Sequence, residues 1–216
     1  MTADGDDQPR REPQYFDDDP TVPSDPVTID VSLPDTAFTL ETDRGVFARG
    51  RLDSGTSLLL RTAVPLASAG HLLDIGCGAG PIALAMARRS PDAVVWAIDV
   101  NERARSLCAR NAQRNGISNI RVCAPDDVPD GLLFDTIWSN PPIRIGKRDL
   151  HALLLRWLVP RTTTGSAALV VQKHLGADSL QRWLTDQSLP TERVASKTGY
   201  RVLVTRPNLQ PDEPTD

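Results

Sequence analysis

The sequence predicts an α/β domain with a doubly wound, mostly parallel seven-stranded sheet. Two observations predict it: apolar segments of strand length alternate with amphipathic helical segments along most of the chain, and a glycine-rich turn joins the first such strand to its helix. An antiparallel hairpin is expected at the C-terminal end of the sheet, and a small β-hairpin extension is expected before it. The pattern is typical of Rossmann-like folds, in which ligands bind beyond the carboxyl ends of the strands.

The individual elements follow from hydrophobic periodicity and from turn residues. Alternation of apolar and polar residues over 27–33 and again at 38–40, with a Pro-Asp pair between them, predicts the first hairpin. The strands of the main sheet are expected at 72–75, 93–98, 120–123, 134–138, 167–171, 193–195 and 200–205, and the helices at 55–66, 81–89, 102–115, 150–158 and 178–186.

The folded domain is expected to span residues 27–206, with 27–54 as the hairpin extension. Residues 1–26 are rich in Asp, Pro and Gln, and residues 207–216 have the same character, so both are expected to be disordered tails.

Charge is distributed unevenly along the chain, whose net charge is −4. Residues 1–30 carry nine acidic and two basic side chains, whereas residues 31–206 carry 22 basic and 16 acidic ones. A basic body is compatible with a phosphate-bearing partner such as RNA, although a solvated Arg-rich surface explains the same excess.

Cysteine and histidine usage argues against disulfides and metal sites. Cys77, Cys108 and Cys123 lack CxxC spacing and are expected to be reduced core thiols, and the three histidines share no metal-ligand spacing. The chain has neither an apolar run long enough to span a membrane nor a signal-peptide pattern, so a cytoplasmic protein without metal is expected, as a monomer or weak homodimer.

The turn after the first core strand has the sequence Asp-Ile-Gly-Cys-Gly-Ala-Gly-Pro, from Asp74 to Pro81. The glycines Gly76, Gly78 and Gly80 let the backbone turn sharply and approach a ligand closely. A dinucleotide fingerprint places its third glycine where Pro81 stands, and an acid beside the turn is a poor neighbour for pyrophosphate. The same acid suits the amine of an amino-acid moiety, which favours S-adenosylmethionine as the cofactor.

Two further acids are predicted to bind the cofactor. Asp99 follows the second strand, where a carboxylate can accept hydrogen bonds from ribose hydroxyls in either class of cofactor. Asp126 or Asp127, after the third strand, is expected to bind the adenine amino group, with Asp126 preferred. Asp126 and Asp127 could instead cap turns.

The tetrapeptide Asn140-Pro141-Pro142-Ile143 follows the fourth core strand and is predicted to be catalytic. The lone pair of an aromatic amine is delocalised into its ring, so an enzyme that methylates it gains by accepting both N–H hydrogens. The Asn140 side-chain oxygen and the Pro141 carbonyl are expected to accept them and to aim the nitrogen. A rigid Asn-Pro turn without catalytic function is the alternative.

Together with that tetrapeptide, several segments resemble the small-domain methyltransferases, a family that includes 16S ribosomal RNA guanine-N2 methyltransferases and their single-domain archaeal and bacterial relatives. The similarity spans residues 27–206 and rests on the segments 42–47, 52–56, 74–80, 140–147 and 199–203. The resemblance implies a methyltransferase acting on an exocyclic amino group of an RNA base, with guanine N2 of 16S ribosomal RNA as the expected target. It also implies that Phe47, Gly55 and Thr56 border the pocket.

The sequence departs from these relatives in two respects. An N-terminal duplicate domain like that of the two-domain ribosomal enzymes is not expected, and Ile143 stands where many relatives have an aromatic residue. An aliphatic side chain can still pack against a base, with less stacking than a ring gives.

Basic residues on both sides of the tetrapeptide are candidates for phosphate contacts. Arg44, Arg49 and Arg51 precede the main domain, whereas Arg144, Lys147 and Arg148 follow the catalytic loop. Three other functions stay open: a protein-glutamine methyltransferase, a non-catalytic cofactor-binding or ribosome-associated protein, and a dinucleotide oxidoreductase.

Overall fold

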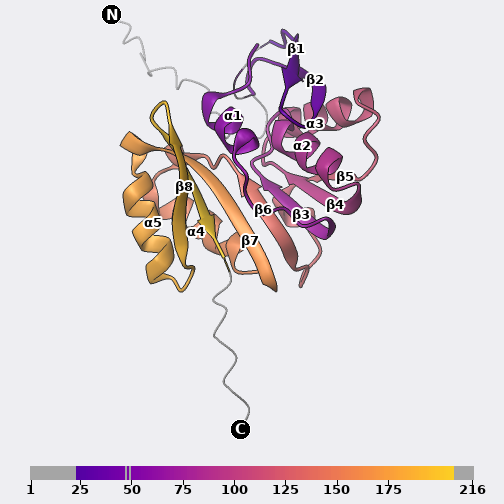
Figure 1. Ribbon diagram of the computed structural model, residues 1–216. Coiled ribbons are helices and arrows are strands. Elements are labelled where there is room, and N and C mark those ends of the chain that lie inside the picture. Colours follow the sequence, from indigo (N-terminus) through magenta and orange to yellow (C-terminus); the bar gives the residue numbers. More distant parts are fainter. Residues whose placement is uncertain (1–22, 47, 49, 207–216) are drawn as a thin grey trace, which may run out of the picture.

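The computed structural model describes residues 23–46, 48 and 50–206. They form a seven-stranded sheet flanked by helices and a separate two-stranded sheet, which confirms the predicted fold class (Figure 1). The strands are β1 (Val27–Ser32), β2 (Ala37–Thr42), β3 (Ala69–Ile75), β4 (Asp92–Ile98), β5 (Ile120–Cys123), β6 (Phe134–Ser139), β7 (Arg161–Gln172), β8 (Thr191–Lys197) and β9 (Tyr200–Thr205). The α-helices are α1 (Ser54–Arg61), α2 (Pro81–Arg89), α3 (Glu102–Arg114), α4 (Lys147–Leu158) and α5 (Ala177–Asp186). Most of the predicted tails, with Phe47 and Arg49, lie outside the described residues.

The order of the strands in the large sheet is β5-β4-β3-β6-β7-β9-β8. Strands β3 to β7 run parallel, and β9 and β8 add an antiparallel hairpin at one edge. The chain progresses outward from β3 to β5 and then returns to place β6 on the other side of β3. The two halves of the sheet therefore diverge between β3 and β6, which is the position where doubly wound folds bind ligands.

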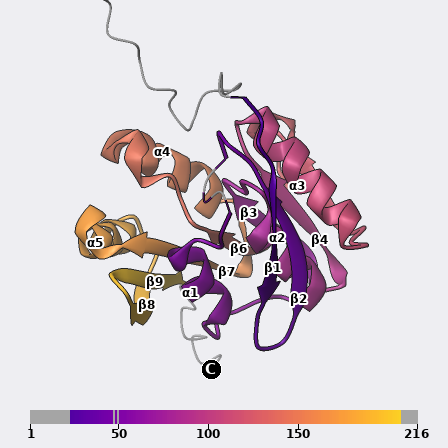
Figure 2. The same ribbon diagram turned by 90° about the horizontal axis from the view of Figure 1, so that it is seen from above.

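Two hydrophobic layers cover the sheet, one on each face. Helices α1, α2 and α3 contribute to one apolar cluster together with the N-terminal hairpin, and α4 and α5 contribute to the other (Figure 2). The central strands are buried on both faces, as expected for a parallel sheet covered by helices. Among the described residues, no helix combines the length and apolar character needed to cross a membrane.

The N-terminal hairpin is held on α3 by two asparagines, Asn111 within the helix and Asn115 at its C-cap. Asn115 accepts a hydrogen bond from Thr39 N at 3.0 Å and donates one to Thr39 O at 2.7 Å. One turn earlier, Asn111 accepts from Glu41 N and donates to Glu41 O, both at 2.8 Å. The two carboxamides thus satisfy the outer edge of β2, as a neighbouring strand would.

Most predicted boundaries agree with the structure to within three residues, and two differ by more. The helix expected over 55–66 ends at Arg61, and the next residue, Thr62, is extended with ψ 136°. Pro65 disfavours helical geometry at Val64 and has no N–H to donate to Arg61 O, so the predicted helix cannot continue to residue 66. Strand β7 begins at Arg161, six residues before the predicted start, because an irregular register lets it follow β6 further back.

Candidate active site

The divergence of the sheet brings the glycine-rich turn and the tetrapeptide loop together. Ile75 and Ser139, the last residues of β3 and β6, are paired in register, and the Ser139 hydroxyl donates to Ile75 O at 2.7 Å. A Cβ atom on Gly76 would lie 3.9 Å from Cδ of Pro142. The two predicted loops are therefore direct neighbours at the carboxyl edge of the sheet.

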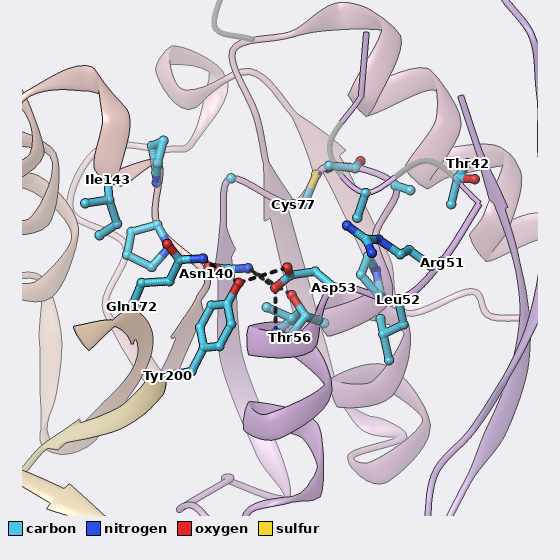
Figure 3. A pocket seen from close by; sticks show the side chains of 18 of the residues that line it. Thr42, Arg51, Leu52, Asp53, Thr56, Cys77, Asn140, Ile143, Gln172 and Tyr200 are labelled. Carbon is cyan, nitrogen blue, oxygen red and sulfur yellow. Dashed lines mark hydrogen bonds between the residues drawn. The ribbon is translucent and has the colours of Figure 1, made fainter. Parts of the chain in front are cut away.

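A pocket of about 280 Å³ opens between these loops (Figure 3). The glycine turn supplies Gly76 and Gly78 to its wall, and the tetrapeptide loop supplies Asn140 to Ile143. The wall also contains residues of the N-terminal extension and of α1, and residues from the ends of β7 and β9. The pocket thus joins segments that are far apart in the sequence.

The glycine turn is fixed by its backbone. Gly76, Gly78 and Gly80 have φ values of 70°, 55° and 89°, in the left-handed region that glycine adopts without a steric penalty. The backbone N–H groups of Gly76 and Cys77 both donate to Ile98 O at 2.9 Å, which anchors the turn to the end of β4. Gly80 also allows close packing, since a Cβ atom there would lie 2.5 Å from Cys108 Sγ.

Asp74 lies beneath the turn and does not line the pocket. Its side chain is fully buried, and Oδ2 accepts a hydrogen bond from Ala83 N at 3.0 Å in the first turn of α2. The other carboxyl oxygen has no partner among the described residues. Burial raises the pKa of Asp74 to about 8, with a further contribution from the nearby Asp99 charge, so the carboxyl is mostly protonated at neutral pH.

Asp99 holds the turn from the other side. Its carboxylate accepts the backbone N–H of Gly78 and the backbone N–H of Asn101, each at 2.9 Å. Burial raises the pKa of Asp99, while these two N–H groups oppose the shift. Each oxygen retains a lone pair that could accept a hydrogen bond from a hydroxyl group.

Asp126 is not brought to the pocket. Its side chain is exposed at the end of β5 and forms an ion pair of 2.8 Å with Arg156 of α4. Its neighbour Asp127 accepts Ala124 N at 3.3 Å, which is a local turn contact. Asp127 thus makes the kind of turn contact that the sequence left open as the alternative, whereas Asp126 is paired at the surface.

Asn140 lies at the centre of a polar network. Its Nδ2 atom donates to Asp53 Oδ2 at 2.9 Å and to the Thr56 hydroxyl at 3.1 Å (Figure 3). Thr56 and Gly55 are buried at the start of α1, and Thr56 lines the pocket. The Pro141 carbonyl accepts Ile143 N at 2.8 Å, which leaves it one lone pair.

The predicted basic residues occupy different positions. Arg144 is exposed and lines the pocket, and Lys147 and Arg148 are exposed in the first turn of α4. Arg51 also lines the pocket, whereas Arg44 pairs with Asp25 at 3.1 Å. The structural predictions for Phe47 and Arg49 concern residues outside the described part of the chain.

Several pocket residues were not among the predicted site residues: Asp53, Gln172, Leu175 and Tyr200. Asp53 and Tyr200 belong to segments that the family resemblance singled out, without a role for either. Gln172 ends β7 and Leu175 follows it, so the rule that ligands bind at carboxyl ends of strands could have marked both.

Comparison with known proteins identifies the family. A model of the methyltransferase small domain matches residues 37–204, which is most of the chain. The chain belongs to this family. Small-domain methyltransferases use S-adenosylmethionine as methyl donor, so this chain is an S-adenosylmethionine-dependent methyltransferase. Among its described residues, no cluster of three or more His, Cys, Asp or Glu side chains is arranged to hold a metal ion.

The relatives of this small-domain methyltransferase differ in length. It is 35% identical over 192 residues to the uncharacterized protein YbxB of Bacillus subtilis, covering 88% of the chain and 96% of that protein. It is 38% identical over 150 residues to ribosomal RNA small subunit methyltransferase C of Shewanella loihica, covering 67% of the chain and 43% of that enzyme. The chain thus spans less than half of that ribosomal enzyme.

A solved structure shows the same fold. The 16S rRNA N2 G1207 methyltransferase of T. thermophilus, in complex with AdoMet and guanosine, superposes with a TM-score of 0.71 at 19% identity. The match covers 88% of this small-domain methyltransferase and 52% of that chain.

Proposed function

We propose that this small-domain methyltransferase transfers a methyl group to an exocyclic amino nitrogen of a nucleobase in RNA, with guanine N2 of 16S ribosomal RNA as the target. The observation that carries the proposal is the position of the Asn140 carboxamide, at the pocket wall beside the glycine turn. Relatives that act on ribosomal RNA support the choice of substrate.

The residues around the turn fit the cofactor. S-adenosylmethionine would supply an electrophilic methyl group on a positively charged sulfur: the S–CH₃ bond would break as the N–CH₃ bond forms, leaving a neutral thioether, and the amine would release one proton. In the proposed arrangement, Gly76, Gly78 and Gly80 let its amino-acid part approach the backbone, and Asp99 accepts the ribose hydroxyls through its remaining lone pairs. Asp74 acts from below by holding the first turn of α2. The adenine contact expected of Asp126 would require its ion pair with Arg156 to open.

The substrate amine is held by oxygen acceptors of the tetrapeptide loop. The Asn140 Oδ1 atom accepts one N–H, and the Pro141 carbonyl accepts the other through its remaining lone pair. Hydrogen bonds to both N–H groups draw the nitrogen toward tetrahedral geometry, which makes its lone pair available for attack. Holding the amine in line with the methyl carbon recovers at most about 7–11 kcal/mol of the barrier. The two prolines keep the loop from relaxing away from this geometry.

The base itself has apolar surface to pack against. Ile143 and Leu175 both line the pocket, and Leu175 has 39% of its surface exposed. Covering Leu175 with a base face removes that surface from water. Arg51, Arg144 and Lys147 would then contact the phosphates of the neighbouring nucleotides.

The test is a methyl-transfer assay with labelled S-adenosylmethionine. The substrates are 16S ribosomal RNA and 30S subunits from cells in which the gene is deleted, and the product is analysed as nucleosides by mass spectrometry. We expect N2-methylguanosine from the wild type, and loss of turnover with unchanged cofactor affinity from Asn140→Ala. Label in protein glutamine, or a wild type that binds the cofactor without transferring methyl to RNA, would contradict the proposal.

A further inference from the structure

The Asn140 carboxamide has its orientation dictated by its neighbours. Both hydrogens of Nδ2 are donated, one to Asp53 Oδ2 at 2.9 Å and one to the Thr56 hydroxyl at 3.1 Å. A carboxylate oxygen can only accept, so the reversed amide would place two acceptors against each other. The nitrogen must therefore face Asp53, and Oδ1 is left on the other side as an acceptor without a partner among the described residues.

Besides Asn140, two groups donate hydrogen bonds to the Asp53 side chain. Its Oδ2 atom accepts Thr56 N at 3.0 Å as the N-cap of α1, and its Oδ1 atom accepts the Tyr200 hydroxyl at 3.4 Å. Gln172 Nε2 donates to the Tyr200 oxygen at 2.6 Å, so the single hydroxyl hydrogen of Tyr200 is available for Asp53. Hydrogen bonds are thus donated in sequence from Gln172 on β7 to Tyr200 on β9, and from Tyr200 to Asp53 at the start of α1.

Packing at Gly55 makes this arrangement possible. A Cβ atom on Gly55 would lie 2.7 Å from Cδ1 and Cε1 of Tyr200, closer than two carbon atoms can approach. The glycine therefore admits the Tyr200 ring against the first turn of α1. Figure 3 shows Tyr200, Asp53, Thr56 and Asn140 converging between Ile143 on one side and Arg51 on the other.

From these contacts we infer that Asp53 is a positioning residue for methyl transfer. It fixes the Asn140 carboxamide so that Oδ1 accepts an N–H of the substrate amine, and Tyr200 and Gln172 hold Asp53 in the required place. The inference rests on the proposed function, because it gives Asn140 the role of acceptor. The competing explanation is that Asp53 serves only as the N-cap of α1.

Two substitutions at Asp53 separate positioning from capping. Ser and Asn are both good N-caps, so each retains the hydrogen bond to Thr56 N. The Asn side chain keeps a carbonyl oxygen at the distance needed to accept from Asn140, whereas the Ser hydroxyl is one bond too short. We expect kcat to fall about 10- to 100-fold in Asp53→Ser, as for a misplaced reacting group, and much less in Asp53→Asn. Equal activity of the two variants would overturn the inference.

A matched control changes a carboxylate of the same kind elsewhere. Asp135 accepts His71 N at 2.9 Å and the Thr162 hydroxyl at 3.1 Å at the opposite end of β6. Asp135→Ser is expected to lower the free energy of unfolding while leaving kcat and the Kd of S-adenosylmethionine near their wild-type values. A fall in kcat as large as that of Asp53→Ser would show that loss of stability explains both.

A double-mutant cycle tests whether Asp53 acts through Asn140. The rate of methyl transfer is measured under single-turnover conditions with excess enzyme. Introducing Asp53→Ser into the wild-type sequence should lower this rate, whereas introducing it into the Asn140→Ala variant should have little further effect. Full additivity of the two effects would indicate that Asp53 contacts cofactor or substrate directly, and would overturn the inference.

A spectroscopic measurement keeps the inference testable without activity. The side-chain NH₂ signals of Asn140, assigned by their loss in Asn140→Ala, should exchange slowly with solvent in the wild type and in Asp53→Asn, and rapidly in Asp53→Ser. Rapid exchange in the wild type would overturn the inference. A wild type that shows slow exchange but methylates no RNA would instead contradict the proposed function alone.

Discussion

Asp74 buries a carboxyl group with one oxygen unpaired, and this makes stability depend on pH. Its pKa is about 8 in the folded protein, against an ordinary value of 3.8. Below pH 3.8 the group is protonated in both states. As pH rises toward 8, the unfolded chain releases the proton while the folded protein retains it, so the free energy of unfolding falls.

Replacing Asp74 removes this titration. Asp74→Asn keeps an oxygen for Ala83 N, so we expect its free energy of unfolding to decline less between pH 4 and pH 8 than that of the wild type. Urea denaturation of both proteins at a series of pH values measures the difference. Parallel curves would show that Asp74 ionises normally in the folded state.

Gly55 offers a second test at the scale of a single residue. In a helix, Gly→Ala normally stabilises by roughly 0.5–1 kcal/mol, but here the new Cβ atom would collide with the Tyr200 ring. We expect Gly55→Ala to displace Tyr200 and to lower the rate of methyl transfer. Ser57→Ala in the same helix is the control, and equal rates for the two variants would contradict the expectation.

The sequence predicted those site residues whose positions follow from local pattern. The glycine turn and Asn140 each come directly after a buried strand, so their place at one edge of the sheet could be predicted. Asp53 and Tyr200 are 147 residues apart, and no periodicity indicates that their side chains meet. The position of Asp126 was predictable too, but not the ion pair with Arg156 that turns its side chain outward.

At the scale of elements, the docking of β2 on α3 relies on side-chain amides in place of a partner strand. Asn115→Ala would remove the hydrogen bonds to Thr39 N and Thr39 O, leaving backbone groups at the edge of β2 without partners. We expect a loss of about 1–3 kcal/mol in the free energy of unfolding. Amide hydrogen exchange at Thr39 should also accelerate.

The control for this element is Gln113→Ala, an exposed position of the same helix. It changes helix composition without touching β2, so stability and exchange should stay close to the wild type. Equal effects of the two variants would assign the loss to helix propensity rather than to docking.

Helix and strand identities were predictable at this scale, but some ends were not. Periodicity predicted the helix α1. Its end at Arg61, however, depends on the extended backbone before Pro65. The asparagines of α3 carry no signal in the sequence, because polar residues on a helix usually face solvent.

At the scale of the whole molecule, charge is predicted to govern RNA binding. Arg144 and Lys147 are exposed near the pocket mouth, so the double variant Arg144→Glu/Lys147→Glu should weaken binding. The slope of log K against log salt should also become shallower, by roughly one for each phosphate that the protein no longer neutralises. Filter binding of 16S ribosomal RNA at several salt concentrations measures both quantities.

Arg121→Glu provides the control. Arg121 lies on β5 at the far edge of the sheet, over the ring of Trp96. Its substitution should leave the salt slope nearly unchanged. If the slope of log K against log salt changed equally in both variants, RNA would be attracted by the overall positive charge of the protein rather than bound at the pocket mouth.

The polar network around Asn140 also ties catalysis to completion of the fold. Its members come from the start of α1, from the loop after β6, and from β7 and β9, so the network is complete only when the edge hairpin has joined the sheet. With that hairpin detached, Asp53 and Thr56 would still contact the amide, but Asp53 would lose the hydroxyl donor of Tyr200. We therefore expect partial unfolding of this sheet edge to lower methyl transfer more than binding of the methyl donor.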